Sequence, residues 1–409
     1  MRLWIKYLIG AVLGIVASFV IPMENPAVNA FFSGFSEFAI RFARYTLLPL
    51  LFFGCAFSIY RMRETKILFK TGFLSIVSIV AFTLILLVIG LISILIVKLP
   101  RIPIPSEKIT EIPNINIKNL VMMIFPFSGF DSVRDGHYLL PAFVFASFIG
   151  YGCSNLKSEV KSVISLLESA SNLFYNVTTF FVEWASVGMV AVSCYWIFEA
   201  RATFASATFV PLCVMLLVDF ILVSVVIYPL VLRFVCKDPR PFHILYASIC
   251  PVIAAFFSGD SNFALQLNIR HGKESLGIHD ETNYFAQSLF AVFSRGGTAL
   301  VSSICFIVIV RSYSALGSTI SDVSWIFCSA FLISFVLGGI PKGGSFVALA
   351  VLCTLYGRGF DTRYLLLKPA APVFCSFAAA FDVLSALYGS YIVAVKTKKF
   401  DHVEFKHFI

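Results

Sequence analysis

The chain has 409 residues, of which 59% are hydrophobic and 13% are charged, and its mean hydropathy is +0.91. This composition excludes an ordinary soluble domain, because apolar runs of about 20 residues, the length that crosses a bilayer core, recur along the chain. The formal net charge of +9 does not indicate nucleic-acid binding, since the Lys and Arg residues lie mostly in short loops, where they set membrane orientation. The runs lack strict alternation of polar and apolar residues, so we predict an all-α polytopic membrane protein.

The first half of the chain contains a series of predicted membrane segments. They cover residues 4–22, 36–60, 70–98, 119–153, 158–196 and 205–235. The fourth is broken by "PFSGFDSVRDGHYLLP" and follows a polar, proline-containing loop. The first run has the alternative interpretation of a cleaved signal peptide, but its length and the later spans favour a retained helix. Basic loops predict that both termini are cytoplasmic, and they lie at residues 61–70, 233–240, 270–273 and 396–399.

The second half predicts two helical hairpins and two unusual helices. Residues 243–275 place the polar turn "SGDSN" between flanks of about 12 residues, each too short to span a bilayer but long enough to reach its middle. Residues 322–357 repeat this shape around "GGIPKGG". The helix at 283–311 is interrupted at "SRGGT", and the last helix, at 363–395, contains Asp382. Discontinuous segments in corresponding positions indicate a transport site near the middle of the membrane.

Two charged residues stand out within these apolar segments. A charge at the bilayer centre costs roughly 3 kcal/mol, so Arg295, beside two helix-weakening glycines, is predicted to serve a binding site. The alternative is that Arg295 lies near a helix end and reaches the interface. Asp382 needs a partner if it is buried, and two remain open: a structural ion pair with Arg295, or the ammonium group of a substrate.

The two hairpin tips supply the remaining candidate binding residues. Asp260, Ser261 and Asn262 lie at the first tip, where an ordinary polar turn is the alternative interpretation. At the second tip, free backbone groups are expected to face a ligand at Gly339, Pro341, Gly343 and Gly344. Lys342, between them, is expected either to face water or to act as a second fixed cation.

The sequence contains no signal for a metal site, an organic cofactor or an enzyme. The ten cysteines lie mostly in apolar runs without C-x-x-C pairing, and the six histidines lack metal-ligand spacing. There is no H-E-x-x-H, no Asp-rich metal motif and no G-x-S-x-G. A transporter is therefore the favoured class, and a transport-dead sensor or a channel-like protein is the alternative.

At this point the motifs resemble those of the dicarboxylate/amino acid:cation symporters, the glutamate-transporter homologues. The resemblance covers nearly the whole chain, from "YTLLPLLFFGCAFSI" and "HYLLPAFVFASFIGYG" to the last helix with "DVLSALYG". It is most specific at the two hairpins, "NFALQLNIRHGKESLGI" and "GGIPKGGSFVALAVL". "GGTALVSSICFIVI" lies where the family has N-M-D-G-T-A followed by an apolar run.

The resemblance implies a homotrimer whose protomers have eight transmembrane helices and two re-entrant hairpins. A mobile transport domain (residues 66–100 and 205–409) would slide against a scaffold (residues 1–65 and 101–204) in an elevator-type motion. The implied substrate is an acidic amino acid or a dicarboxylate, with a neutral amino acid or another small organic anion as the alternative. The implied coupling ion is Na⁺ or H⁺. No organelle-targeting signal is visible, so we expect a cell inner membrane.

Individual family residues carry over unevenly. Ser261 falls on a hairpin serine that contacts substrate, Thr298 keeps the threonine of N-M-D-G-T, and Asp382 matches the aspartate that takes the substrate amino group. The residues from Ile340 to Gly344 keep the second-hairpin backbone. The arginine that grips a substrate side-chain carboxylate is replaced by Ser385.

The family's cation-binding positions are degraded in this sequence. Ser294 and Gly296 replace the Asn and Asp of N-M-D-G-T, and Gly389 replaces a later Asn. Hard cations need several oxygen ligands, which these replacements remove. We hypothesise that Arg295 supplies the positive charge of the bound sodium, with coupling either absent or carried by protons through Asp260 or Asp382.

Overall fold

A computed structural model describes most of the chain. The described residues are 2–22, 25–103, 126, 128–134, 138–156, 159–205, 207–313, 319–336, 344–357 and 359–409. In these ranges 85% of the structure is helical and there is no strand, only an isolated antiparallel bridge between Ile278 and Phe400. Eight helical segments among these described residues are long and apolar enough to cross a membrane. The predicted all-α polytopic fold is confirmed.

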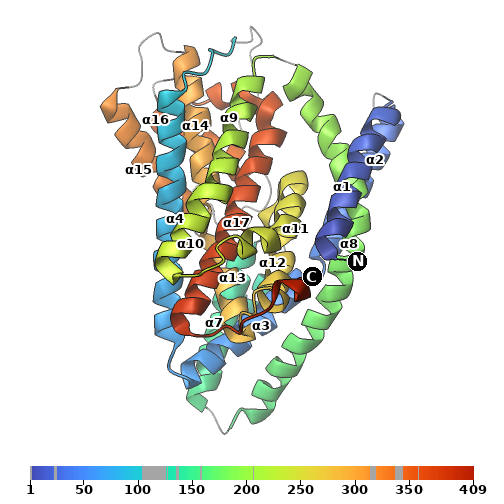
Figure 1. The fold of residues 1–409 in the computed structure, drawn as a ribbon, viewed down its shortest axis with the longest axis vertical. Helices are drawn as coiled ribbons and strands as arrows, with labels where there is room; N and C mark the ends of the chain where they lie inside the picture. Colours follow the sequence, from blue (N-terminus) through green and yellow to red (C-terminus); the bar gives the residue numbers. More distant parts are fainter. Residues whose placement is uncertain are drawn as a thin grey trace.

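The helices follow the order that the sequence predicts (Figure 1). The first half comprises α1 (Leu3–Val20), α2 (Pro26–Arg44), α3 (Leu47–Glu64), α4 (Leu68–Ile96), α6 (Gly129–Arg134), α7 (Leu139–Leu156), α8 (Lys161–Ala205), α9 (Val210–Ile221), the π-helix η1 (Leu222–Ile227) and α10 (Tyr228–Cys236). The second half comprises α11 (His243–Ser258), α12 (Ser261–Glu274), α13 (Asp280–Phe293), α14 (Gly296–Tyr313), α15 (Ile320–Val336), α16 (Gly344–Tyr356), the 3-10 helix η3 (Arg363–Ala370), α17 (Ala371–Thr397) and the 3-10 turn η4 (Phe405–His407).

The predicted segment 36–60 is two helices in the structure, and the first begins ahead of the prediction. The Asn25 side chain accepts a hydrogen bond from the Ala27 N–H, and Pro26 at the first helical position has no N–H to lose, so α2 begins there. Only Tyr45 and Thr46 separate α2 from α3. The Thr46 hydroxyl lies 2.9 Å from that of Thr178 on α8, which fixes this joint against the long helix.

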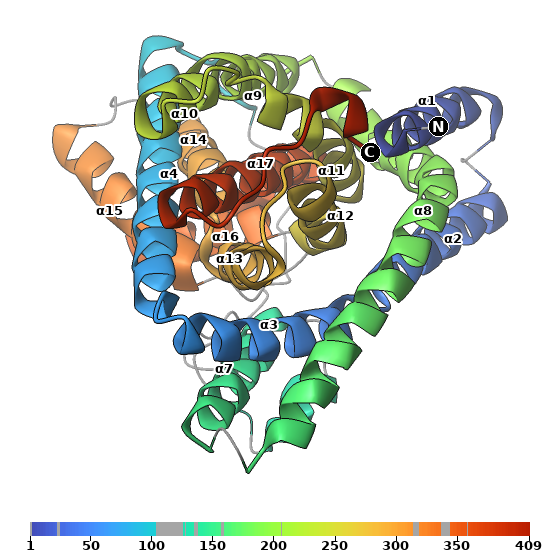
Figure 2. The ribbon, with the colours of Figure 1, turned by 60° about the horizontal axis from the view of Figure 1, so that its bottom comes forward.

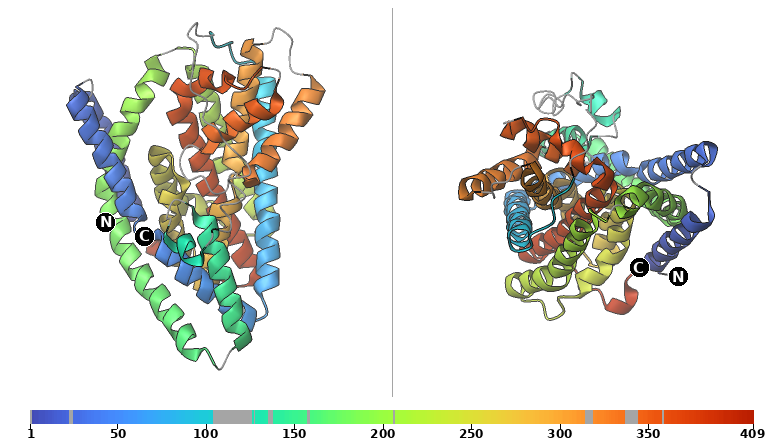
Figure 3. Two further views of the ribbon diagram at one scale, coloured as in Figure 1. Left: turned by 180° about the vertical axis from the view of Figure 1, so that it is seen from behind. Right: turned by 90° about the horizontal axis from the view of Figure 1, so that it is seen from above.

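Small residues bring α1 close to α8. A Cβ atom at Gly10 would collide with the Ser186 carbonyl, and one at Gly14 with the Ser193 hydroxyl and the Val190 carbonyl. Glycines at such positions let two membrane helices approach closely. These helices form an arm with α2 beside the rest of the molecule (Figure 3), and Figure 2 shows α3 and α8 outside a central group of α11 to α14, α16 and α17.

The centre of the molecule is formed by α13, α14 and α17. Every residue of α14 from Gly296 to Val310 is buried, and so is nearly all of α17 after Phe377. A helix buried on all sides can be apolar all round, which explains the unbroken apolar runs in these segments. The helix pairs α11–α12 and α15–α16 match the two predicted hairpins in position, and their re-entry into the membrane stays a prediction.

Candidate functional site

The predicted interruption at "SRGGT" separates α13 from α14. Helix α13 ends at Phe293, and α14 begins at Gly296, so Ser294 and Arg295 lie between two helices. A Cβ atom at Gly297 would collide with the Ala378 carbonyl and lie 2.5 Å from the Phe381 Cβ, so only glycine permits this approach of α14 to α17. The break thus places the free N–H groups of α14 directly against the last helix.

Asp382 accepts hydrogen bonds from the beginning of α14. The Gly297 N–H donates to its Oδ1 at 2.8 Å, and the Thr298 hydroxyl donates to its Oδ2 at 3.2 Å. The Arg295 Nη1 lies 3.9 Å from the same Oδ2. The positive end of a helix dipole and a guanidinium therefore both stabilise this buried carboxylate.

Arg295 is buried with unused hydrogen-bond donors. Its side chain is 6% exposed, and its Nη1 donates to the Ser261 hydroxyl at the first hairpin tip. Within the described residues, its Nε and Nη2 have no hydrogen-bond partner. Because an unsatisfied buried donor costs about 1–3 kcal/mol, and more when charged, these two groups are suited to bind an anion.

At the first hairpin tip, Ser261 belongs to the site, whereas Asp260 is bonded to residues outside it. Gly259 ends α11 in the left-handed region with φ +61°, and Asp260 caps α12 by accepting from the Asn262 N–H at 2.8 Å. The other oxygen of Asp260 pairs with the Arg44 Nη1 of α2 at 2.9 Å. Ser261, the first residue of α12, faces Arg295.

Two small pockets flank the Arg295 guanidinium, and both are lined by Ser261, Arg295 and Asp382. The first is otherwise lined by Gly259, Thr298, Gly344, Ser345, Cys375, Ala378 and Ala379. The second is otherwise lined by Leu265, Asn268, Phe290, Ala291, Ser294, Val383 and Ala386. The Asn268 Oδ1 and the Ser294 Oγ are also buried without a partner among the described residues, so they are available as oxygen ligands.

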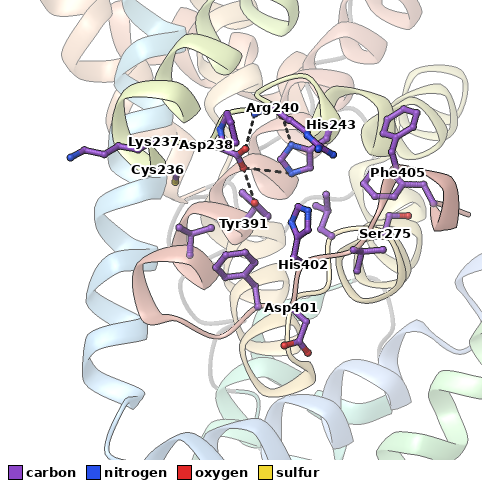
Figure 4. Close-up of a pocket in the computed structure, with 16 residues that line it drawn as sticks. Cys236, Lys237, Asp238, Arg240, His243, Ser275, Tyr391, Asp401, His402 and Phe405 are labelled. Carbon is purple, nitrogen blue, oxygen red and sulfur yellow. Dashed lines mark hydrogen bonds and ion pairs between the residues drawn. The ribbon is translucent and has the colours of Figure 1, made fainter.

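A larger pocket lies elsewhere, under the C-terminal tail (Figure 4). There Asp238 accepts a hydrogen bond from the Tyr391 hydroxyl at 2.8 Å, and the His243 Nε2 lies 3.9 Å from the same carboxylate. Its lining shares no residue with the two pockets around Arg295. Both carboxylates of its lining, Asp238 and Asp401, already have partners, Tyr391 and His279, so we place the candidate binding site at Arg295.

The structure therefore brings together Ser261, Arg295, Thr298, Gly344 and Asp382 from four helices and the α13–α14 break. Gly339, Ile340, Pro341 and Gly343, with Lys342, lie outside the described residues.

The remaining predicted residues face other neighbours. Ser385 does not line either pocket, because its hydroxyl lies 2.6 Å from that of Tyr228 and 2.6 Å from the Phe381 carbonyl. Asn262 is likewise absent from both linings.

Both predicted cation-site glycines, Gly296 and Gly389, have a packing role. A Cβ atom at Gly389 would run into the ring of Phe290, and one at Gly296 would lie 2.9 Å from Leu86 and 3.0 Å from Thr83 on α4. Gly389 lets α13 pack closely against α17, and Gly296 lets α4 pack closely against α14. Neither glycine offers a side-chain oxygen.

Several lining residues on α17 and α16 were not predicted from the sequence. Cys375, Ala378 and Ala379 precede Asp382 by seven, four and three residues, which places all of them on one helical face. Helical spacing from Asp382 is the signal that identifies them. Ser345 follows the second hairpin tip directly, and its hydroxyl donates to the Cys375 Sγ at 3.1 Å.

Comparison with known proteins assigns this architecture to a family. The model of the sodium:dicarboxylate symporter family matches residues 3–396. The chain belongs to this family. It is accordingly a multi-pass membrane transporter of the symporter type, with a small-molecule substrate and the lipid bilayer as its surroundings. No curated protein matches the sequence.

Proposed function

We propose that this symporter carries a small carboxylate, either an acidic amino acid or a dicarboxylate, bound at the Arg295 guanidinium. The observation that supports this most directly is the pair of unpartnered donors, Nε and Nη2, on an arginine that lines both pockets. A carboxylate accepts two parallel hydrogen bonds from such a guanidinium. The hydroxyls of Ser261 and Thr298 lie on the same pocket wall and are placed to complete its coordination.

In this proposal Arg295 also takes the place of a bound cation. Its charge lies 3.9 Å from Asp382, at the position where the family motif has a methionine between its Asn and Asp. A covalently fixed charge neutralises a buried carboxylate without an ion gradient. Uptake by this protein is then independent of sodium, and either protons or exchange drive it.

The geometry also favours a second candidate, a neutral amino acid. The first of the two pockets is lined by one arginine, Arg295, and one aspartate, Asp382. These charges match the carboxylate and the ammonium group of a zwitterion. Ser385, in place of the family arginine that grips a second carboxylate, is bonded to Tyr228 instead. Competition by alanine or serine, without competition by succinate, would select this candidate.

We place the site in an elevator-type homotrimer in the cell inner membrane, with both termini cytoplasmic. Residues 66–100 and 205–409 form the proposed transport domain, and residues 1–65 and 101–204 the scaffold. The contact of Arg44 on α2 with Asp260 then joins the scaffold to the moving hairpin. The packing of α1, α2 and α8 as one arm is compatible with this division.

The deciding experiment is uptake of labelled glutamate, succinate and alanine into proteoliposomes, with and without a sodium gradient. We expect uptake of at least one of these without sodium, and its loss in Arg295→Gln. Arg41→Gln is the matched control, because Arg41 is exposed and pairs only on the surface with Glu37. Strict sodium dependence in the wild type, or full uptake by Arg295→Gln, would refute the assignment.

A further inference from the structure

Three carboxylates are buried in the described part of the chain, and one of them is unlike the others. They are Asp219, Asp260 and Asp382, exposed by 2%, 1% and 4%. Asp260 pairs with an arginine on α2, and Asp382 lies beside Arg295. Asp219, on α9, makes no ion pair with any described residue, although it lies within a membrane-spanning segment. An unpaired ionised carboxylate is expensive to bury, so its state needs an explanation.

The hydrogen bonds around Asp219 fit a protonated carboxyl group. Its Oδ2 lies 2.9 Å from the Ser93 Oγ on α4, and the same Oγ lies 3.1 Å from the Gly90 carbonyl. A serine hydroxyl has one proton to donate. Both contacts are satisfied when Ser93 donates to the Gly90 carbonyl and a protonated Asp219 donates to the Ser93 Oγ. A carboxylate would compete with the carbonyl for the single hydroxyl proton.

The elements packed against α9 offer Asp219 no cation. The face of α17 toward α9 is aromatic, where Phe377 and Phe381 lie with ring centroids 6.4 and 5.2 Å from that of Phe220. The acid of α17, Asp382, is bonded instead to the beginning of α14.

An arginine does approach α4 near this point, but it bonds elsewhere. Arg311 of α14 donates to the Ile94 carbonyl at 2.9 Å, one residue beyond Ser93. The side chain that α4 turns toward Asp219 is thus a neutral serine.

Asp219 also lies beside an unusual piece of backbone. It is about nine residues, or ~14 Å, along the helix from Val210, and the π-helix η1 follows at Leu222. Single π-turns within α-helices occur frequently at functional sites. Helix α9 packs against α4 and against α17 (Figure 1), and α17 also carries Asp382 of the Arg295 site.

We propose that Asp219 is a proton-binding site of this symporter and carries the coupling proton. The proposal rests on the proposed transport function, and it moves the coupling group away from Asp260 and Asp382, whose charges arginines already balance. A proton from water binds the carboxylate on the side of higher proton concentration, and it is released to water on the other side. Substrate and proton then occupy separate sites in the same group of helices.

Uptake driven by an imposed pH gradient tests the coupling. We expect wild-type uptake to be accelerated by an inward proton gradient, and Asp219→Asn to lose that acceleration while still exchanging substrate across the membrane. Asp219→Glu should retain it, and so should Asp131→Asn, a matched control at an exposed aspartate of α6. An undiminished gradient response in Asp219→Asn would overturn the proposal.

A second measurement decides the protonation of Asp219 even if the transport function is assigned wrongly. Infrared difference spectra of the purified protein, titrated with pH, should show the carbonyl stretch of a protonated carboxyl group at neutral pH. We expect Asp219→Asn to lose this band and Asp131→Asn to keep it. If the band is absent from the wild type, or persists in Asp219→Asn and disappears in Asp382→Asn, Asp219 is not the proton site.

Discussion

The pairing of Arg295 with Asp382 makes a quantitative prediction for a double-mutant cycle. At the observed 3.9 Å between Nη1 and Oδ2, two unit charges attract by about 4 kcal/mol at an effective dielectric constant of 20. Removal of one member of a buried pair leaves the other charge uncompensated, which costs about 3–5 kcal/mol, whereas neutralising both members is often nearly neutral. Asp382→Asn and Arg295→Met should each destabilise the protein, and the double variant should be more stable than the sum of the two losses predicts.

The structure also predicts that the two single variants are unequal. Without Arg295, Asp382 keeps its hydrogen bonds from Gly297 and Thr298. Without the carboxylate charge, Arg295 keeps only its bond to the Ser261 hydroxyl. Asp382→Asn should therefore be the more destabilising substitution.

Thermal unfolding in detergent, followed by intrinsic fluorescence, measures this cycle. At roughly 2 °C per kcal/mol, Asp382→Asn should lower the Tm by about 6–10 °C. The double variant should recover much of that loss and still fail to bind substrate, because both charged groups of the site are gone. Simple additivity of the two single effects would refute the reasoning, since it would mean that the two charges do not interact.

Two further predictions concern residues that pack or bond near the site. Gly389→Ala should place a methyl group against the ring of Phe290 and cost about 1–3 kcal/mol of stability, and the added substitution Phe290→Leu should recover part of it in the same thermal assay. Ser385→Ala should cost about 1 kcal/mol through its lost bond to Tyr228 and leave substrate affinity unchanged, as isothermal titration would show; a large loss of affinity would place Ser385 in the binding site after all.

The sequence predicted the architecture because its signals are local. Hydrophobic length located most of the spans, and the interruption predicted at residues 294–298 contains the observed break at Ser294 and Arg295 between α13 and α14. The approach of Arg295 to Ser261 joins two segments that periodicity cannot relate, so it could be expected only from the charge and the family resemblance.

Which residues belong to the site depends on contacts between helices that cannot be predicted from a single sequence. Position 389 corresponds to a cation-binding Asn of the family, but the ring of Phe290 here occupies the space that a side chain at position 389 would need. Position 385 corresponds to the family arginine that binds a substrate carboxylate, but the Ser385 hydroxyl here is hydrogen-bonded to that of Tyr228 on α10. In both cases a residue from another helix decides what the position does, and its identity could not be inferred from the motif.

The three buried carboxylates suggest why a fixed arginine at position 295 is tolerated. Asp382 needs a positive neighbour whether or not substrate is bound, and a mobile cation would have to be rebound in every cycle. In the proposed function Arg295, 3.9 Å from Asp382, supplies that charge permanently, so that substrate binding would not depend on an ion gradient. If the proposal holds, a transporter without a bound coupling cation still needs another group that responds to a gradient in order to concentrate its substrate. Among the buried acids that the structure describes, only Asp219 has no arginine to hold its charge, and it is therefore the one whose charge a proton must balance.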